Sequence, residues 1–192
     1  MSVIFVTGRI GSGKSVFTKC LQDLGATVVD ADKIVAELYE KNPQMVADIE
    51  KVIGRPIRDH SGNVNKEIIA QQIFTDDELR NKIERIIHPL VRKEMESSIS
   101  KSNGVYVYEI PVVTADTDLK LATKIVVIDA PEELRRERLI ERGMHLADID
   151  ARIASQSRNQ VQIKDAIYIS NTSSLEDLKQ AAHSIFLDAL DD

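Results

Sequence analysis

Residues 8–15, with the sequence Gly-Arg-Ile-Gly-Ser-Gly-Lys-Ser, constrain the fold of this chain more than any other stretch. They match the pattern G-x-x-x-x-G-K-[ST], and they stand between an apolar run at 3–7 and a helical pattern at 16–24. In such a strand–loop–helix context, backbone N–H groups surround a phosphate chain, and glycine permits positive φ angles and close approach. The sequence therefore predicts a nucleoside-triphosphate site. The alternative is a glycine-rich turn that binds nothing. Such a turn would not need the complete motif, so the motif favours the nucleotide site.

The residue types of this loop also predict roles. The helix that starts near Lys14 contributes free N–H groups and about half a positive charge at its N-terminus. Lys14 supplies a charge for the β- and γ-phosphates, and the Ser15 hydroxyl is placed to bind Mg²⁺. The predicted nucleotide-binding residues are Gly8, Gly11, Ser12, Gly13, Lys14, Ser15 and Val16.

Length and charge narrow the class of protein. A chain of 192 residues predicts one domain with a sub-lobe. The net charge of −6 argues against a protein that coats nucleic acid, so a local basic cluster must hold any anionic ligand. The single Cys20 allows no intrachain disulfide and fits a reducing compartment. Because no stretch approaches the roughly 20 apolar residues of a membrane span, and residues 1–7 lack the basic region of a signal peptide, we expect a soluble, cytoplasmic protein.

Two aspartates follow the second predicted strand. The short run at 26–29 ends at Asp30-Ala31-Asp32, and in open parallel sheets ligands bind beyond the carboxyl ends of the strands. Aspartate is also a favoured N-cap, and a helical pattern follows at 34–38. We expect one aspartate to cap that helix and the other to face the substrate, with Asp32 the better candidate for catalysis.

The stretch from residue 33 to about 103 contains helical patterns and no convincing strand. An ordinary βαβ crossover uses one helix, so about seventy residues of additional helix predict a lobe for the second substrate. Pro89 interrupts the last helical pattern, which predicts a kink or break near His88. His88 is one of four histidines, and their spacing is not that of metal ligands. Taken alone, such a histidine more often has a structural than a functional role.

Three further strands complete the predicted sheet, at 105–110, 123–128 and 166–169, and a helix is expected at 174–190. The first of these strands ends near Glu109. This carboxylate either holds the hydration shell of Mg²⁺ or pairs with an arginine of a lid, and both alternatives remain open at this point.

Arginines are concentrated between the last two strands. Arg135, Arg138 and Arg142 are spaced i, i+3 and i+7, hence on one helical face. The neighbouring glutamates could pair with some of them on a solvated helix. Phosphoryl transfer, in contrast, needs guanidinium groups at the γ-phosphoryl group, where one arginine contributes about 10³–10⁵ in rate. A basic helical flap at this position is typical of the lid of P-loop kinases.

Several motifs follow one another along nearly the whole chain: 8–15, Asp30-Ala31-Asp32, His88-Pro89-Leu90-Val91-Arg92, Pro111, Asp129-Ala130-Pro131, 152–156 and Asn171. In this order they resemble the bacterial dephospho-coenzyme A kinase family. The resemblance implies a P-loop three-layer α/β/α fold with a five-stranded parallel sheet, a helical acceptor-binding lobe and a lid. It also implies phosphorylation of the ribose 3′-hydroxyl of dephospho-CoA by ATP with Mg²⁺, the last step of coenzyme A synthesis.

The resemblance implies roles for individual residues. Asp32 matches the acid that orients or deprotonates the acceptor hydroxyl, and together with Lys14, Arg138 and Arg142 it makes up the predicted catalytic set. The predicted substrate-binding residues are Asp30, His88, Arg92 and Glu109, and the predicted metal ligand is Ser15.

The implied organisation is a single kinase domain. Its core is expected at 1–32, 104–135 and 165–192, its helical acceptor lobe at about 33–103 and its lid at about 136–164. The expected partners are the small molecules ATP and dephospho-CoA, without nucleic acid or membrane, and the expected state is a monomer or weak homo-oligomer.

The chain also departs from the family pattern. Where the family reads D-x-P-L-L-F-E, residues 109–115 read Glu-Ile-Pro-Val-Val-Thr-Ala, with Asp116 one residue on as a substitute for the second acid. Lys66 stands where an arginine is usual, and Arg158 is matched only roughly. These departures bear on acceptor affinity. Two alternatives are another small-molecule kinase and a nucleotide-binding regulatory module without transfer activity; the helical lobe and the arginine-rich lid disfavour the module.

Overall fold

The computed structural model describes the chain except residues 60, 61, 66, 67, 70, 71, 73–75, 100–103, 111, 112, 114–116, 118, 159–161 and 192. For residues 77, 157 and 158 it describes the backbone and not the side chain. Lys66, Pro111, Asp116 and the side chain of Arg158, which the sequence comparison singled out, therefore lie outside the described residues.

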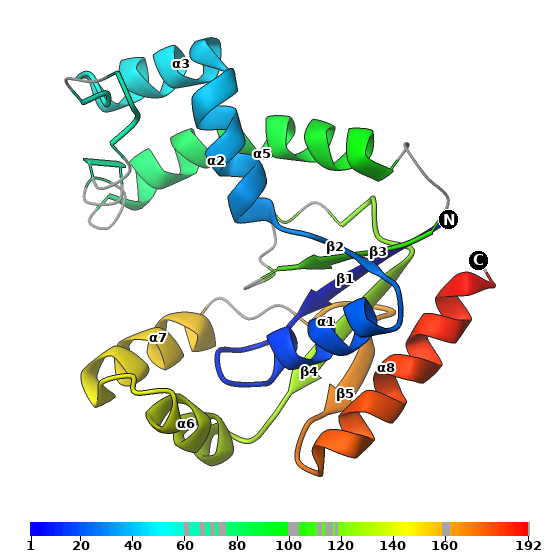
Figure 1. Ribbon diagram of the computed structural model, residues 1–192. Helices are drawn as coiled ribbons and strands as arrows, with labels where there is room; N and C mark the ends of the chain where they lie inside the picture. Colours follow the sequence, from blue (N-terminus) through cyan, green and yellow to red (C-terminus); the bar gives the residue numbers. More distant parts are fainter. Residues whose placement is uncertain are drawn as a thin grey trace. The chain divides into compact units, whose positions relative to one another are not determined.

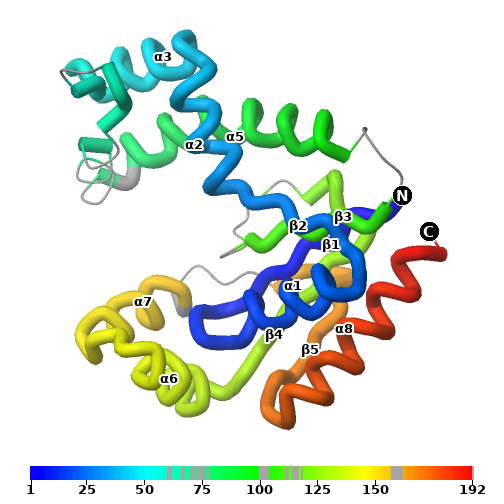
Figure 2. Tube along the Cα trace, viewed as in Figure 1, coloured from blue at the N-terminus to red at the C-terminus, as the bar shows by residue number. Residues whose placement is uncertain are grey.

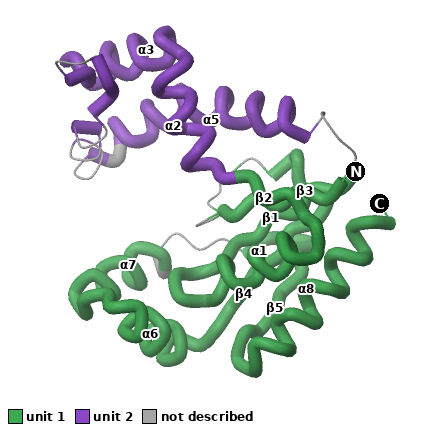
Figure 3. Tube along the Cα trace, in the orientation of Figure 1, with its two compact units in different colours: residues 1–29, 102–192 green, residues 30–101 purple. Residues whose placement is uncertain are grey.

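The described chain divides into two units, which Figure 3 colours separately. The first comprises Met1–Val29 together with Ser102–Asp192, and the second comprises Asp30–Lys101. The first unit contains the sheet and the glycine-rich loop, and the second is built from helices. The assignment of an acceptor lobe and a lid to particular segments stays a prediction.

A five-stranded parallel sheet forms the centre of the first unit, with the strand order β2-β3-β1-β4-β5 (Figure 1). The strands are β1 (Ser2–Thr7), β2 (Thr27–Val29), β3 (Val105–Glu109), β4 (Lys124–Asp129) and β5 (Ile167–Ser170). All six residues of the central strand β1 are buried, which explains its almost continuous apolar sequence. The predicted α/β class with a five-stranded parallel sheet is confirmed.

Two helices pack together against the sheet, α1 (Lys14–Asp23) and α8 (Leu175–Leu190). On α8, Leu178, Ala182, Ile185 and Ala189 recur at helical spacing and join the main hydrophobic core. Ser174 caps α8, and its hydroxyl and the Asp177 carboxylate form a capping box. Cys20 of α1 packs partly buried against the same core.

A helical pair follows β4 in the chain, α6 (Glu132–Glu141) and α7 (Leu146–Arg158). Its small apolar cluster consists of Leu139, Ile149 and Ile153, with Met144 and Ile10 packed against it. Because Ile10 belongs to the glycine-rich loop, this cluster ties the helical pair to that loop.

The second unit contains α2 (Ala31–Lys41), α3 (Pro43–Ile53) and α5 (Asp77–Ile99) around a core of its own. Of the predicted kink or break near His88, the break does not occur, because α5 runs through Pro89 as one helix, and the kink stays a prediction. A proline inside a helix removes one backbone hydrogen bond. Apolar side chains on both sides of it, Ile83, Ile86, Ile87, Leu90 and Val91, pack against the core of this unit and hold the helix together.

Candidate active site

The glycine-rich loop connects the end of β1 to the start of α1, as the trace in Figure 2 shows. Gly13 is the N-cap of α1 and lies in the left-handed region, with φ of 103°. A Cβ on Gly13 would lie 2.2 Å from the Asn171 amide nitrogen, so a side chain is excluded there by space as well as by conformation. Gly11 has a φ of 77°, and a Cβ there would lie 2.7 Å from the Arg135 carbonyl oxygen.

Lys14 lies folded back over this loop. Its Nζ donates hydrogen bonds to the carbonyl oxygens of Gly8 at 2.8 Å and Arg9 at 3.4 Å. Burial lowers the pKa of the Lys14 ammonium group, the Glu109 carboxylate raises it, and the Arg142 guanidinium lowers it. The predicted residues Lys14, Glu109 and Arg142 are therefore close enough to interact electrostatically.

Ser15 and Glu109 form the second contact of the site. The Ser15 hydroxyl donates a hydrogen bond of 2.9 Å to Glu109 Oε1. Glu109 is the last residue of β3 and pairs in register with Val6 of β1, which brings its carboxylate to the loop edge of the sheet. This contact brings the Glu109 carboxylate next to the predicted metal ligand Ser15, and the role of Glu109 stays a prediction.

The pair of Ser15 and Glu109 fits a magnesium ion. Mg²⁺ prefers oxygen ligands, keeps several water ligands and is usually bound through one or two carboxylates together with substrate phosphates. Among the described residues no cluster of three or more histidines, cysteines or acids is suited to a metal. Such a cluster is not needed for an ion that phosphates help to bind.

The arginines of α6 divide into two groups. Arg138 donates to the backbone oxygens of Asn171 at 3.0 Å and of Gly11 and Ser12 at 3.5 Å each. The exposed Arg142 caps the C-terminus of α6. Arg136, in contrast, forms ion pairs with Glu132 and Asp150 on the solvent side, as expected for a solvated charged helix.

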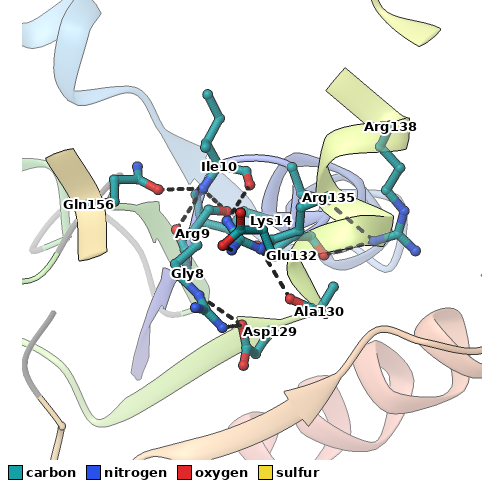
Figure 4. A network of polar contacts seen from close by, with 12 residues as sticks. Gly8, Arg9, Ile10, Lys14, Asp129, Ala130, Glu132, Arg135, Arg138 and Gln156 are labelled. Atoms are coloured by element: carbon teal, nitrogen blue, oxygen red, sulfur yellow. Dashed lines mark hydrogen bonds and ion pairs between the residues drawn. The ribbon is translucent and has the colours of Figure 1, made fainter. Parts of the chain in front are cut away.

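Residues from other segments of the first unit also contact the loop. The sequence predictions gave three of them, Asp129, Gln156 and Asn171, no role in the site. Arg9 pairs with Asp129 at 2.7 Å, and the Ile10 N–H donates to Gln156 Oε1 at 2.7 Å (Figure 4). The Asn171 side chain donates to the Ser12 carbonyl oxygen at 2.7 Å. Asp129, Gln156 and Asn171 all lie in segments that carried the family resemblance, which was the one signal that could have singled them out.

The remaining predicted residues lie elsewhere. Val16 is the third residue of α1 and is 36% exposed. In the second unit, Asp30 is the N-cap of α2 and accepts a hydrogen bond of 3.1 Å from the Lys33 N–H, whereas Asp32 is exposed in the first turn. The expectation that one of the two aspartates caps the helix is therefore confirmed, and Asp30 is the cap.

His88 and Arg92 also lie in the second unit, on α5. His88 is exposed, and Arg92 Nε donates to Glu96 Oε1 at 2.9 Å. The role of Asp30, Asp32, His88 and Arg92 at a site shared with the P-loop stays a prediction.

A P-loop between the central strand of a parallel sheet and its helix, with arginines on a following helix, defines a P-loop kinase. A family model described as dephospho-CoA kinase matches residues 2–177. The chain belongs to the dephospho-CoA kinase family, whose members phosphorylate dephospho-CoA to coenzyme A with ATP. The predicted family and its kinase activity are confirmed.

Individual relatives agree with this assignment. A dephospho-CoA kinase of Aquifex aeolicus is 32% identical over 190 residues, covering 97% of this chain and 96% of the relative. One of Mycobacterium tuberculosis strain H37Rv is 34% identical over 187 residues, which are 95% of this chain and 46% of that longer relative. The solved dephospho-CoA kinase from Campylobacter jejuni is 26% identical with a TM-score of 0.68, covering 97% of this chain and 96% of that one. In the described part of the chain, no helix is long and apolar enough to span a membrane.

Proposed function

We propose that this chain transfers the γ-phosphoryl group of ATP to the ribose 3′-hydroxyl of dephospho-CoA, with the residues of its first unit binding the nucleotide. One observation carries the assignment of the nucleotide site. Lys14, Ser15 and Glu109 meet at the N-terminus of α1, with Arg142 close enough to shift the pKa of Lys14. A cation, a hydroxyl and a carboxylate in this place serve phosphate and magnesium, and they have no evident function in packing.

The loop binds the nucleotide through its backbone. The N–H groups at the start of α1 point out of the helix, and the positive end of the helix dipole favours an anion there. Lys14 adds a full positive charge, and its contacts with the Gly8 and Arg9 carbonyl oxygens hold it over the loop. Gly8, Gly11, Ser12, Gly13 and Val16 complete the proposed nucleotide site.

Ser15 and Glu109 would hold Mg²⁺ at the same place. When bound, the ion offsets the negative charge that develops on the phosphate oxygens during transfer. Ser15 contributes its hydroxyl oxygen, and Glu109 contributes a carboxylate oxygen that accepts the Ser15 hydrogen bond in the present arrangement. Binding of the ion would replace that hydrogen bond.

Catalysis needs an acceptor hydroxyl in line with the γ-phosphoryl group and a group that takes its proton. We propose Asp32 for the second task, because it is exposed, follows β2 closely in the chain and is not the helix cap. Arg138 and Arg142 offset charge on the transferring group. Asp30, His88 and Arg92 are the proposed acceptor residues of the helical unit.

The experiment is an assay of ADP release with dephospho-CoA, with other alcohols such as adenosine and shikimate, and without acceptor. The proposal predicts rapid release with dephospho-CoA and at most slow release in the other reactions. Rapid release with another acceptor would identify a small-molecule kinase of altered specificity. ATP binding without acceptor-dependent release would identify a regulatory module.

A further inference from the structure

Among the described residues, Arg135 is the largest fully buried side chain, with an exposed fraction of 1%. Its Nε donates to the Ala130 carbonyl oxygen at 3.1 Å, and its Nη1 donates to the Ile10 carbonyl oxygen at 3.3 Å. The guanidinium group therefore bridges the end of β4 and the middle of the P-loop, which are about 120 positions apart in the sequence (Figure 4).

This burial is costly and only partly compensated. Among the described residues Arg135 Nη2 has no hydrogen-bond partner, and its distance to a Glu132 carboxylate oxygen is 3.9 Å. A buried arginine with incomplete partners usually contributes less to stability than an apolar side chain of similar size. Stability alone therefore gives no reason for an arginine at this position.

The contact with Ile10 determines how one peptide group of the loop is oriented. A trans peptide is planar, so the Ile10 carbonyl and the Gly11 N–H point in opposite directions. A guanidinium group fixed on the Ile10 oxygen therefore turns the Gly11 N–H toward the other side of the loop. The α6 backbone also lies close to this peptide, since a Cβ on Gly11 would be 2.7 Å from the Arg135 carbonyl oxygen.

We propose that Arg135 is a positioning residue for ATP: its guanidinium group holds the Ile10–Gly11 peptide with the N–H directed at the phosphates. Arg135 does not touch the nucleotide and acts through the loop. The inference rests on the proposed nucleotide site, and it adds a residue of α6 that binds no phosphate itself.

The test compares ATP affinity and melting temperature, both in the absence of acceptor. Arg135→Met keeps a long side chain and removes the guanidinium group. Arg136→Met is the matched control, because Arg136 lies next to it on α6 and pairs with Glu132 and Asp150 at the surface. Calorimetric titration with ATP and Mg²⁺ is done well below the melting temperature of each variant.

We expect the Kd for ATP to rise tenfold or more in Arg135→Met and to stay within twofold of the parent in Arg136→Met. In steady-state assays, the KM for ATP should rise in Arg135→Met while the KM for dephospho-CoA stays unchanged. A folded Arg135→Met variant with the parental Kd, or an equal loss in both variants, would overturn the inference. If the parent itself does not bind ATP, the proposed nucleotide site fails, and that result is distinct from either outcome for Arg135.

Arg135→Lys decides the matter if Arg135→Met does not fold. Lysine keeps the charge and the apolar stem, but a single ammonium group cannot reproduce the planar fork that joins the two carbonyl oxygens. We expect a folded protein whose Kd for ATP is at least threefold above that of the parent. A parental Kd in Arg135→Lys would show that the bridge does not position the loop.

Discussion

Lys14 offers the most direct single-residue test of the nucleotide site. Because burial lowers its pKa, the folded protein disfavours the charge, and removal of the charge should not destabilise the fold through this effect. We expect Lys14→Met to lower kcat/KM roughly 10²–10³-fold, as for the loss of one electrostatic stabiliser, with the melting temperature at or above that of the parent. Lys19→Met on the exposed face of α1 is the control and should leave kcat/KM unchanged. A folded Lys14→Met enzyme with parental turnover would contradict the role of the P-loop.

Replacements of Asp30 and Asp32 should differ in their effects on stability and on kcat. Asp30 accepts the hydrogen bond from the Lys33 N–H that caps α2. Because Asp30→Ala removes this cap, it should lower the free energy of unfolding by about 1 kcal/mol. Asp32→Asn removes a charge without removing a cap, and loss of a general base lowers kcat roughly 10²–10⁴-fold. Urea unfolding and steady-state kinetics on both variants measure the two effects. Parental kcat in Asp32→Asn would place the base elsewhere, with Glu109 the first residue to examine.

At the scale of elements, Arg138 on α6 and Arg142 at its C-cap should affect ATP binding and kcat differently. Arg138 hydrogen-bonds to backbone oxygens of the loop, whereas the exposed Arg142 acts on Lys14 through its charge. We expect Arg142→Ala to lower kcat about 10³-fold, the lower end for one arginine at a transferring phosphoryl group, with the Kd for ATP within threefold of the parent. Arg138→Ala should weaken ATP binding and lower kcat together. Titration calorimetry measures the Kd for ATP, and single-turnover rates measure the chemical step. If Arg142→Ala lost ATP binding but kept the parental kcat, Arg142 would bind ATP in the ground state, which would contradict its role in phosphoryl transfer.

Tyr108, in strand β3, should make the stability of the fold depend on pH. Tyr108 is buried in edge-to-face contact with Phe5, and burial raises its pKa from 10.0 to about 12. Since the folded-state value lies above the unfolded one, the contribution of Tyr108 is complete below pH 10 and is lost as the pH rises from about 10 to 12. Urea unfolding at pH 9 and pH 11.5 should show a fall in stability that is smaller in Tyr108→Phe by roughly 1–3 kcal/mol. If the free energy of unfolding fell equally in the parent and in Tyr108→Phe, the raised pKa of Tyr108 would be contradicted.

The elements themselves were largely predictable from local patterns. The apolar run at 2–7, the periodic pattern after it and the strands near 105, 124 and 167 all appear close to their predicted bounds. The helix does not break at Pro89, as one alternative of the prediction had it, because apolar side chains on both sides of the proline pack against the core of the second unit. Spacing placed Arg135, Arg138 and Arg142 on one face, but it could not show that two of them bind loop carbonyl oxygens.

At the scale of the whole molecule, the site depends on contacts between distant segments. The hydrogen bonds of Ile10 with Gln156 and of Ser12 with Asn171 join residues 146 and 159 positions apart. No local pattern carries such pairings, and the sequence indicated Gln156 and Asn171 only through the family resemblance. The motif G-x-x-x-x-G-K-[ST], in contrast, contains its chemistry within eight residues, which is why Lys14 and Ser15 were predictable with their roles.

The central claim is that this chain makes coenzyme A from dephospho-CoA. The most direct measurement is identification of the product after incubation with ATP, Mg²⁺ and dephospho-CoA, by mass spectrometry for the added phosphoryl group and by phosphorus NMR for its position. The account predicts one phosphoryl group on the ribose 3′-oxygen, formed in step with ADP and almost absent with Lys14→Met. Unmodified dephospho-CoA in the presence of the folded, ATP-binding parent, or a phosphoryl group at another position, would contradict it.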